Sequence, residues 1–173
     1  MKQITTVLVG FILAGSASSQ AMIVWDSAAK LTWADFQGKA DRKSQFNAVT
    51  VSGIYYKFDL GAGGYRDSIM AVFFTAESWV KDSSESQLIH EQGHFDITEI
   101  FARILRKRRM EFIPGRGSLG RQLKTLYDGV ERERDEMELL YDRQTGHSAN
   151  AAMQRYWNQK IRNELQPLEQ YAY

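Results

Sequence analysis

Strand-like and helix-like segments divide this chain near residue 84. From Ala48 to Leu60 the residues are mainly β-branched or aromatic, and Ile69 to Thr75 is a short, nearly continuous apolar run. The segment Gly61-Ala-Gly-Gly64 lies between them. β-branched and aromatic residues favour strands, and a glycine cluster favours a turn. The pattern therefore predicts a β-hairpin whose second strand is the more buried.

Three amphipathic helices are predicted after this hairpin. The first covers Gln87 to about Arg109, because apolar residues recur at helical intervals and Ser84 and Gln87 have the spacing of a capping box. The second covers residues 119–141, and the third, capped by Ser148, continues to about residue 165. Strands followed by helices predict an α+β domain in which helices cover one face of a small antiparallel sheet.

The N-terminal 21 residues have the pattern of a signal peptide. Lys2 precedes an apolar stretch over residues 7–14, and a small-x-small site follows directly before Met22. This stretch is too short for the ~20 residues that a membrane-spanning helix needs. We expect residues 1–21 to be removed and residues 22–173 to form one domain without a membrane span. The mature protein would then lie in the periplasm or outside a bacterial cell.

Composition narrows the classes of partner and chemistry. The chain has 22 basic and 21 acidic residues and no long block of like charge, so nothing indicates nucleic acid or an anionic membrane as a partner. It has no cysteine, which excludes cysteine-ligated zinc sites and cysteine nucleophiles. A metal site in this chain must therefore use histidine and carboxylate ligands.

Two of the three histidines lie in His90-Glu-Gln-Gly-His94, the H-E-x-x-H pattern of zinc hydrolases. Positions four apart on a helix differ by only ~40° around its axis, so the two imidazoles would lie on one face and could bind one Zn²⁺ ion. Glu91 falls about a quarter-turn to the side. From there its carboxylate could act as general base on a zinc-bound water without being a ligand.

A catalytic zinc ion usually has three protein ligands and one open position. Glu99 lies on the same predicted helix but points away from the two histidines. His147 is the preferred third ligand, because it follows Gly146 in a predicted loop where the backbone is free to turn. A carboxylate on the second predicted helix, such as Glu133 or Glu136, is the alternative.

Several segments together resemble one family. They are Leu31–Gly38, Ser78–Val80, His90–Glu99, and Tyr141-Asp142 with Thr145 and His147. The chain resembles exported bacterial proteins classed as secreted zinc-dependent proteases, a domain of unknown function. This resemblance implies a zincin-like fold, with zinc at His90 and His94, Glu91 as base and His147 as third ligand. Asp96 stands where the broad zincin pattern has an apolar residue, and we expect it to make solvent-facing contacts or to orient a neighbouring group.

The expected function is hydrolysis of a peptide or protein substrate by Glu91-assisted attack of a zinc-bound water. An oxyanion donor would help, and Tyr141 is the first candidate, followed by Tyr127 and Tyr156. One alternative is a non-catalytic zinc-binding or interaction domain with a zincin shape, although a purely structural site has no need of Glu91. Another is hydrolysis of the amide bonds of cell-wall peptides, which the same residues would support.

Overall fold

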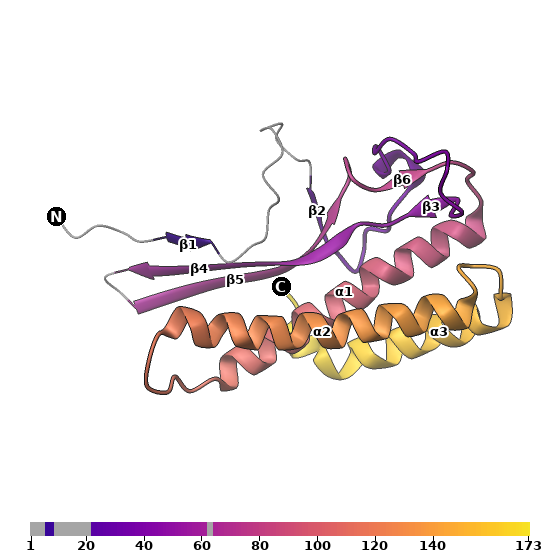
Figure 1. The fold of residues 1–173 in the computed structure, drawn as a ribbon. Coiled ribbons are helices and arrows are strands. Elements are labelled where there is room, and N and C mark those ends of the chain that lie inside the picture. The colour runs from indigo at the N-terminus through magenta and orange to yellow at the C-terminus, as the bar shows by residue number, and fades with distance from the viewer. Residues whose placement is uncertain (1–5, 9–21, 62–63) are drawn as a thin grey trace.

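The computed structural model describes residues 6–8, 22–61 and 64–173, which form an α+β fold (Figure 1). The strands are β1 (Thr6–Leu8), β2 (Met22–Val24), β3 (Ala48–Val49), β4 (Ser52–Gly61), β5 (Gly64–Phe74) and β6 (Trp79–Val80). The helices are α1 (Glu85–Glu111), α2 (Leu119–Thr145) and α3 (Ala151–Leu165), with short 3₁₀ helices η1 (Trp33–Asp35) and η2 (Gln166–Tyr171). The predicted combination of a small antiparallel sheet with three helices is confirmed over these residues.

The predicted hairpin is the centre of a four-stranded antiparallel sheet in the order β1-β4-β5-β2. On β4 the side chains of Ile54, Tyr56 and Phe58 alternate onto one buried face, as the period-two geometry of a strand requires. On β5 the consecutive residues Ala71, Val72 and Phe73 are all buried. The second strand is therefore the more buried one, as the apolar run predicted.

The first part of the predicted strand forms a separate, smaller sheet. Ala48 and Val49 make β3, which pairs with β6 rather than with β5. The break has a local cause, because the Val51 N–H donates to the Ser78 Oγ at 2.9 Å and not to a neighbouring strand. The prediction of one continuous strand from residue 48 is therefore wrong, and β4 begins only at Ser52.

Helix α1 is the central element of the core, because it packs on β4 and β5 and also on α2 and α3. The Ser84 Oγ accepts a hydrogen bond from the Gln87 N–H at 3.2 Å, so the predicted N-cap is confirmed. Ile97, Ala102 and Leu105 of this helix are fully buried. Burial of a side chain such as Leu105 contributes roughly 1.5–3 kcal/mol, which fixes the helix firmly on the sheet.

Helices α2 and α3 run side by side along α1 (Figure 1). The cap of α3 is Asn150, whose Oδ1 accepts from the Met153 N–H at 3.1 Å. The prediction that Ser148 caps this helix is wrong, because Ser148 lies in the preceding turn with a φ of 73°. Trp157 anchors α3, since its ring is fully buried and its Nε1–H donates to Gln144 Oε1 at 2.8 Å.

A buried group of charges joins α1 to the C-terminal segment. Glu99 accepts from Arg103 Nε at 2.9 Å and from Arg106 Nη1 at 3.0 Å. Arg106 also donates to the carbonyl oxygens of Ile69 and Tyr171, both at 2.8 Å. The basic run at the end of α1 is therefore only partly on a solvated face, because Arg106 is turned inward to satisfy buried groups.

Most of the expected signal peptide, residues 1–5 and 9–21, lies outside the described residues. Its Thr6–Leu8 segment pairs antiparallel with β4, Val7 opposite Phe58. If residues 1–21 are removed as we expect, the sheet of the mature domain keeps β4, β5 and β2. In the described part of the chain, no helix has both the length and the apolar character to cross a membrane.

Candidate metal and hydrolytic site

The two motif histidines face the same side of α1, one helical turn apart. Their Nε2 atoms are 3.2 Å from each other, and their ring centroids are 4.8 Å apart. His90 is buried and His94 is partly buried. The helix thus brings the two imidazoles to the spacing that the H-E-x-x-H pattern predicts.

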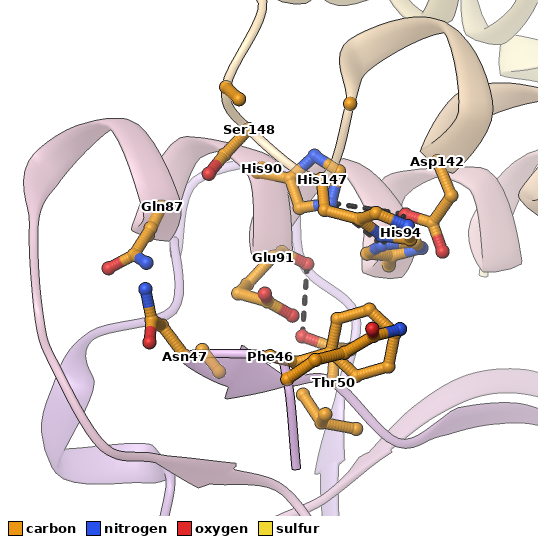
Figure 2. Close-up of a pocket in the computed structure, with 15 residues that line it drawn as sticks. Phe46, Asn47, Thr50, Gln87, His90, Glu91, His94, Asp142, His147 and Ser148 are labelled. Atoms are coloured by element: carbon orange, nitrogen blue, oxygen red, sulfur yellow. Dashed lines mark hydrogen bonds and ion pairs between the residues drawn. The ribbon is translucent and has the colours of Figure 1, made fainter.

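A carboxylate from α2 meets both imidazoles. Asp142 Oδ1 lies 3.2 Å from His90 Nε2 and 3.1 Å from His94 Nε2. His147, from the turn after α2, brings its Nδ1 to 3.3 Å from the same oxygen (Figure 2). Nitrogen atoms of three histidines therefore surround one carboxylate oxygen.

An unusual turn brings Asp142 and His147 together. Helix α2 ends at Thr145, and the next residue, Gly146, is its C-cap. Gly146 is left-handed with φ 58°, and its N–H donates to the Asp142 carbonyl oxygen. The next two residues, His147 and Ser148, also have positive φ, at 50° and 73°. Side chains other than glycine adopt this region at a cost of order 1–3 kcal/mol each, so the surrounding contacts must hold the turn in place. The turn folds His147 back toward the side chain of Asp142.

Other groups engage the far nitrogen of each motif histidine. The Glu138 carboxylate contacts His94 Nδ1, and Gln154 Oε1 lies 3.1 Å from His90 Nδ1. With Nδ1 engaged in this way, the Nε2 atoms of both rings face the shared centre. Two residues, one on α2 and one on α3, thus orient the imidazoles.

The electrostatics of this centre favour positive charge. Burial opposes protonation of His94, but the carboxylate of Glu138 and the hydrogen bond to Asp142 outweigh it and raise the pKa of His94 to about 10. Burial would favour the neutral acid at Asp142, yet hydrogen bonds from His90 and His94 hold the pKa of that carboxyl well below its usual range. A cation bound among these side chains would be stabilised by the same carboxylates that stabilise the proton on His94.

Glu91 lies beside the histidines with its side chain on the wall of a cavity of about 580 Å³. Its residue is only 5% exposed. Thr50 Oγ1 donates to the backbone carbonyl of Glu91 at 3.2 Å, but among the described residues none bonds to its carboxylate. The carboxylate oxygens are not among the enclosed unpaired side-chain atoms of the described residues, so they face the cavity and can bind a molecule that enters it.

The cavity lies between α1, the segment that includes β3, and the turn after α2. Its lining also includes Gln45, Phe46, Asn47, Ala48, Val49, Thr50, Gln87, Gly146, Ser148 and Ala149. Apart from Glu91 and Asp142, the lining carries no side chain of fixed charge. The chemistry of the cavity is therefore concentrated at one end, where the histidines and the two carboxylates meet.

The predicted oxyanion donors do not reach this cavity. Tyr141 is fully buried behind the histidines, where its hydroxyl donates to the His90 carbonyl at 3.0 Å and accepts from Gln154 Nε2 at 2.7 Å. Tyr127 donates to the Ile54 carbonyl at 3.1 Å, and Tyr156 is exposed on α3. Tyr141 instead supports His90, whose ring stacks on the phenol ring at 4.7 Å.

The carboxylates that approach the site also differ from those expected. Glu133 is exposed and pairs with Arg108 at 2.7 Å, and Glu136 is exposed and does not line the cavity. The carboxylates that arrive from α2 are Glu138 and Asp142. Their spacing of four residues places them on one helix face, and Asp142 also belongs to a segment that resembles the family; these are the sequence signals that could have indicated them.

Asp96 lies away from the cavity. Its Oδ1 accepts hydrogen bonds from Trp25 Nε1 at 2.7 Å and from Gln92 Nε2 at 2.8 Å, and Lys30 Nζ is 3.5 Å away. The residue therefore fastens the segment after β2 to α1. It supports the fold around the motif helix and makes no hydrogen bond to His90 or His94.

The donor atoms have a spacing that suits a small metal ion. Zinc–nitrogen bonds of ~2.0–2.1 Å in a tetrahedral site separate neighbouring donors by about 3.3–3.4 Å. The separations among His90 Nε2, His94 Nε2 and Asp142 Oδ1 are 3.1–3.2 Å. Donor atoms of His90, Asp142 and His147 also lie within 4.8 Å of one another. Comparisons with protein-family models, curated proteins and solved structures found no match, so the function must be inferred from this geometry.

Proposed function

We propose that this chain is an exported, zincin-like zinc peptidase in which Glu91 is the general base. The observation that carries the proposal is the Glu91 carboxylate, which lies on the cavity wall beside His94 and accepts no hydrogen bond from the described residues. It lies directly beside the histidine and Asp142 cluster. A domain that only bound zinc would gain nothing from a carboxylate that faces the cavity beside the ligands without being one of them.

The donor set fits zinc. Imidazole nitrogens with one carboxylate oxygen are common ligands of catalytic zinc, and the spacing of three donors near 3.2 Å agrees with a tetrahedral site. Glu138 and Gln154 hold the other nitrogens of His94 and His90, as the outer partners of metal-bound histidines do. A bound zinc ion would supply positive charge for the carbonyl oxygen of the substrate and would lower the pKa of the attacking water.

The protein's own part in hydrolysis is the movement of one proton. Glu91 accepts a proton from the attacking water as the new C–O bond forms at the peptide carbonyl. It then donates that proton to the amide nitrogen as the C–N bond breaks, which releases an amine and a carboxylic acid. The acid passes the remaining water proton to the amine or to solvent and becomes a carboxylate. The low exposure of Glu91 keeps bulk water from competing for this proton.

The cavity wall supports an extended peptide as substrate. Strand β3 has one neighbour, β6, in the described part of the chain, so its other edge has no partner strand. The Asn47 carbonyl accepts from Lys81 N–H, on the β6 side, so the next residue, Ala48, directs its backbone groups away from β6. An extended peptide can pair with such an edge.

The test is hydrolysis of a peptide library by the mature protein, followed by mass spectrometry, together with zinc content. We expect the wild type to hold one zinc ion per chain and to cleave a subset of peptides. Glu91→Gln should keep the zinc but lower kcat by at least ~100-fold, since general base catalysis contributes ~10²–10⁴-fold. Glu85→Gln, on the exposed first turn of the same helix, is the matched control and should retain full activity.

Two outcomes would overturn the proposal. Activity of Glu91→Gln equal to that of the wild type would remove the base from the mechanism. Stoichiometric zinc binding by a wild type that cleaves no peptide would favour the non-catalytic domain. Cleavage confined to cell-wall peptides would retain Glu91 as base and change only the substrate.

A further inference from the structure

We infer that Asp142 is a direct metal ligand together with His90 and His94, and that His147 is a fourth donor that the substrate displaces. The inference rests on the proposed function, which supplies the metal ion. It changes the ligand set preferred from the sequence, in which His147 was the third ligand. A carboxylate from the second helix was the alternative there, but Asp142 was not the residue named.

The first argument is the shape formed by three donor atoms. His90 Nε2, His94 Nε2 and Asp142 Oδ1 form a nearly equilateral triangle with sides of 3.2, 3.2 and 3.1 Å. This is close to the edge of a zinc tetrahedron, about 3.3–3.4 Å. The triangle is one complete face of such a site, and it is made without His147.

The second argument separates direct ligands from their supports. Outer partners of metal-bound histidines bind the ring nitrogen that does not hold the metal. Glu138 and Gln154 have that position, because they contact Nδ1 of His94 and of His90. Asp142 instead contacts Nε2 of both rings, on the metal-facing side. Its carboxylate is therefore placed as a ligand and not as a support.

His147 differs from the other donors in how firmly it is held. Its side chain is 48% exposed, whereas that of His90 is 4% exposed and that of His94 is 15% exposed. Its Nδ1 faces Asp142, and its own backbone is left-handed, with φ 50°. Among the described residues, no group bonds to its Nε2. The ring contacts that of Phe46, with centroids 4.8 Å apart. A ligand without a fixed orientation contributes less affinity, because binding must first order it.

A displaceable fourth donor resolves a conflict in the site. Four protein ligands would complete a tetrahedron, whereas a catalytic zinc ion keeps one position open for water or substrate. Departure of His147, the most exposed of the four donors, would open that position on the side of the cavity. Asp142, His90 and His94 would keep the ion in place throughout.

The test compares zinc affinity, measured by competition with a chelator, in Asp142→Asn, His147→Ala and the wild type. Asp142→Asn keeps the size of the side chain and should raise the Kd for zinc by more than ~100-fold, beyond the range typical of outer partners. His147→Ala should raise it by less than ~10-fold and keep one ion per chain. Asp135→Asn, an exposed residue of α2, is the control and should bind zinc like the wild type.

A second measurement examines displacement directly. With cobalt(II) in place of zinc, acetohydroxamate binding is followed in the visible spectrum, and it should be tighter in His147→Ala because no protein donor competes. Wild-type zinc affinity in Asp142→Asn, with loss of zinc in His147→Ala, would overturn the inference. Equal acetohydroxamate affinity would exclude displacement of His147. Because these measurements need no turnover, they can succeed or fail independently of peptide hydrolysis in Glu91→Gln.

Discussion

The substitution Gly93→Ala tests how the motif helix and α2 fit together. Gly93 lies between the two histidines of the motif, against the phenol ring of Tyr141. A Cβ at this position would lie 2.7 Å from Tyr141 Cζ, and the hydroxyl oxygen would be closer still. Carbon atoms do not pack at that distance, so α1 and α2 would have to separate locally.

The size of the effect follows from two costs and one gain. Forced overpacking in a core costs ~1–3 kcal/mol. Alanine in place of glycine inside a helix recovers ~0.5–1 kcal/mol. Displacement of Tyr141 would also disturb its hydrogen bonds to the His90 carbonyl and from Gln154, each worth ~0.5–1.5 kcal/mol. Together these contributions lower the free energy of unfolding of Gly93→Ala by about 1–5 kcal/mol.

Guanidinium unfolding of the metal-free protein is the assay, and Gly129→Ala is the matched control. Gly129 also lies inside a helix, but a Cβ there would meet nothing within 4 Å. This control should therefore gain ~0.5–1 kcal/mol. In a Tyr141→Phe background the closest contact is absent, and the penalty for Gly93→Ala should be smaller. Equal stability of Gly93→Ala and Gly129→Ala would refute the proposed close approach.

Two further predictions concern groups outside the site. Glu99→Ala should destabilise the protein by roughly 3–5 kcal/mol, because it leaves Arg103 and Arg106 without their buried anion. The control is Glu133→Ala, which removes an exposed carboxylate and should cost less than ~1 kcal/mol. Equal denaturation midpoints for the two variants would contradict this prediction. Burial raises the pKa of Tyr127 from its ordinary value of 10.0 to about 12, so the folded state favours the neutral phenol. The free energy of unfolding should then fall as pH rises from 10 to 12. Denaturation at a series of pH values should show a smaller fall for Tyr127→Phe than for the wild type. An equal fall in the two proteins would show that the pKa of Tyr127 is the same in the folded and unfolded states.

Local patterns were sufficient for those features that depend on near neighbours in the chain. The helical period and the Ser84 cap fixed α1, and the four-residue spacing put His90 and His94 on one face with Glu91 beside them. The hairpin followed from residue type and glycine placement. Ser148 was predicted to cap α3 in place of Asn150, because the turn after Gly146 continues through two more left-handed residues. No side-chain pattern in the sequence predicts such a turn.

The sequence by itself determined the two imidazoles, the neighbouring carboxylate and the order of strands and helices, because each depends on contacts a few residues long. Only the tertiary structure decided which carboxylates of α2 contact the two imidazoles. Glu138 and Asp142 lie 44 and 52 residues from the histidines they meet, and the contact depends on the angle at which α2 packs on α1. It likewise decided that Tyr141 lies behind His90, since that follows from the close approach of the two helices at Gly93.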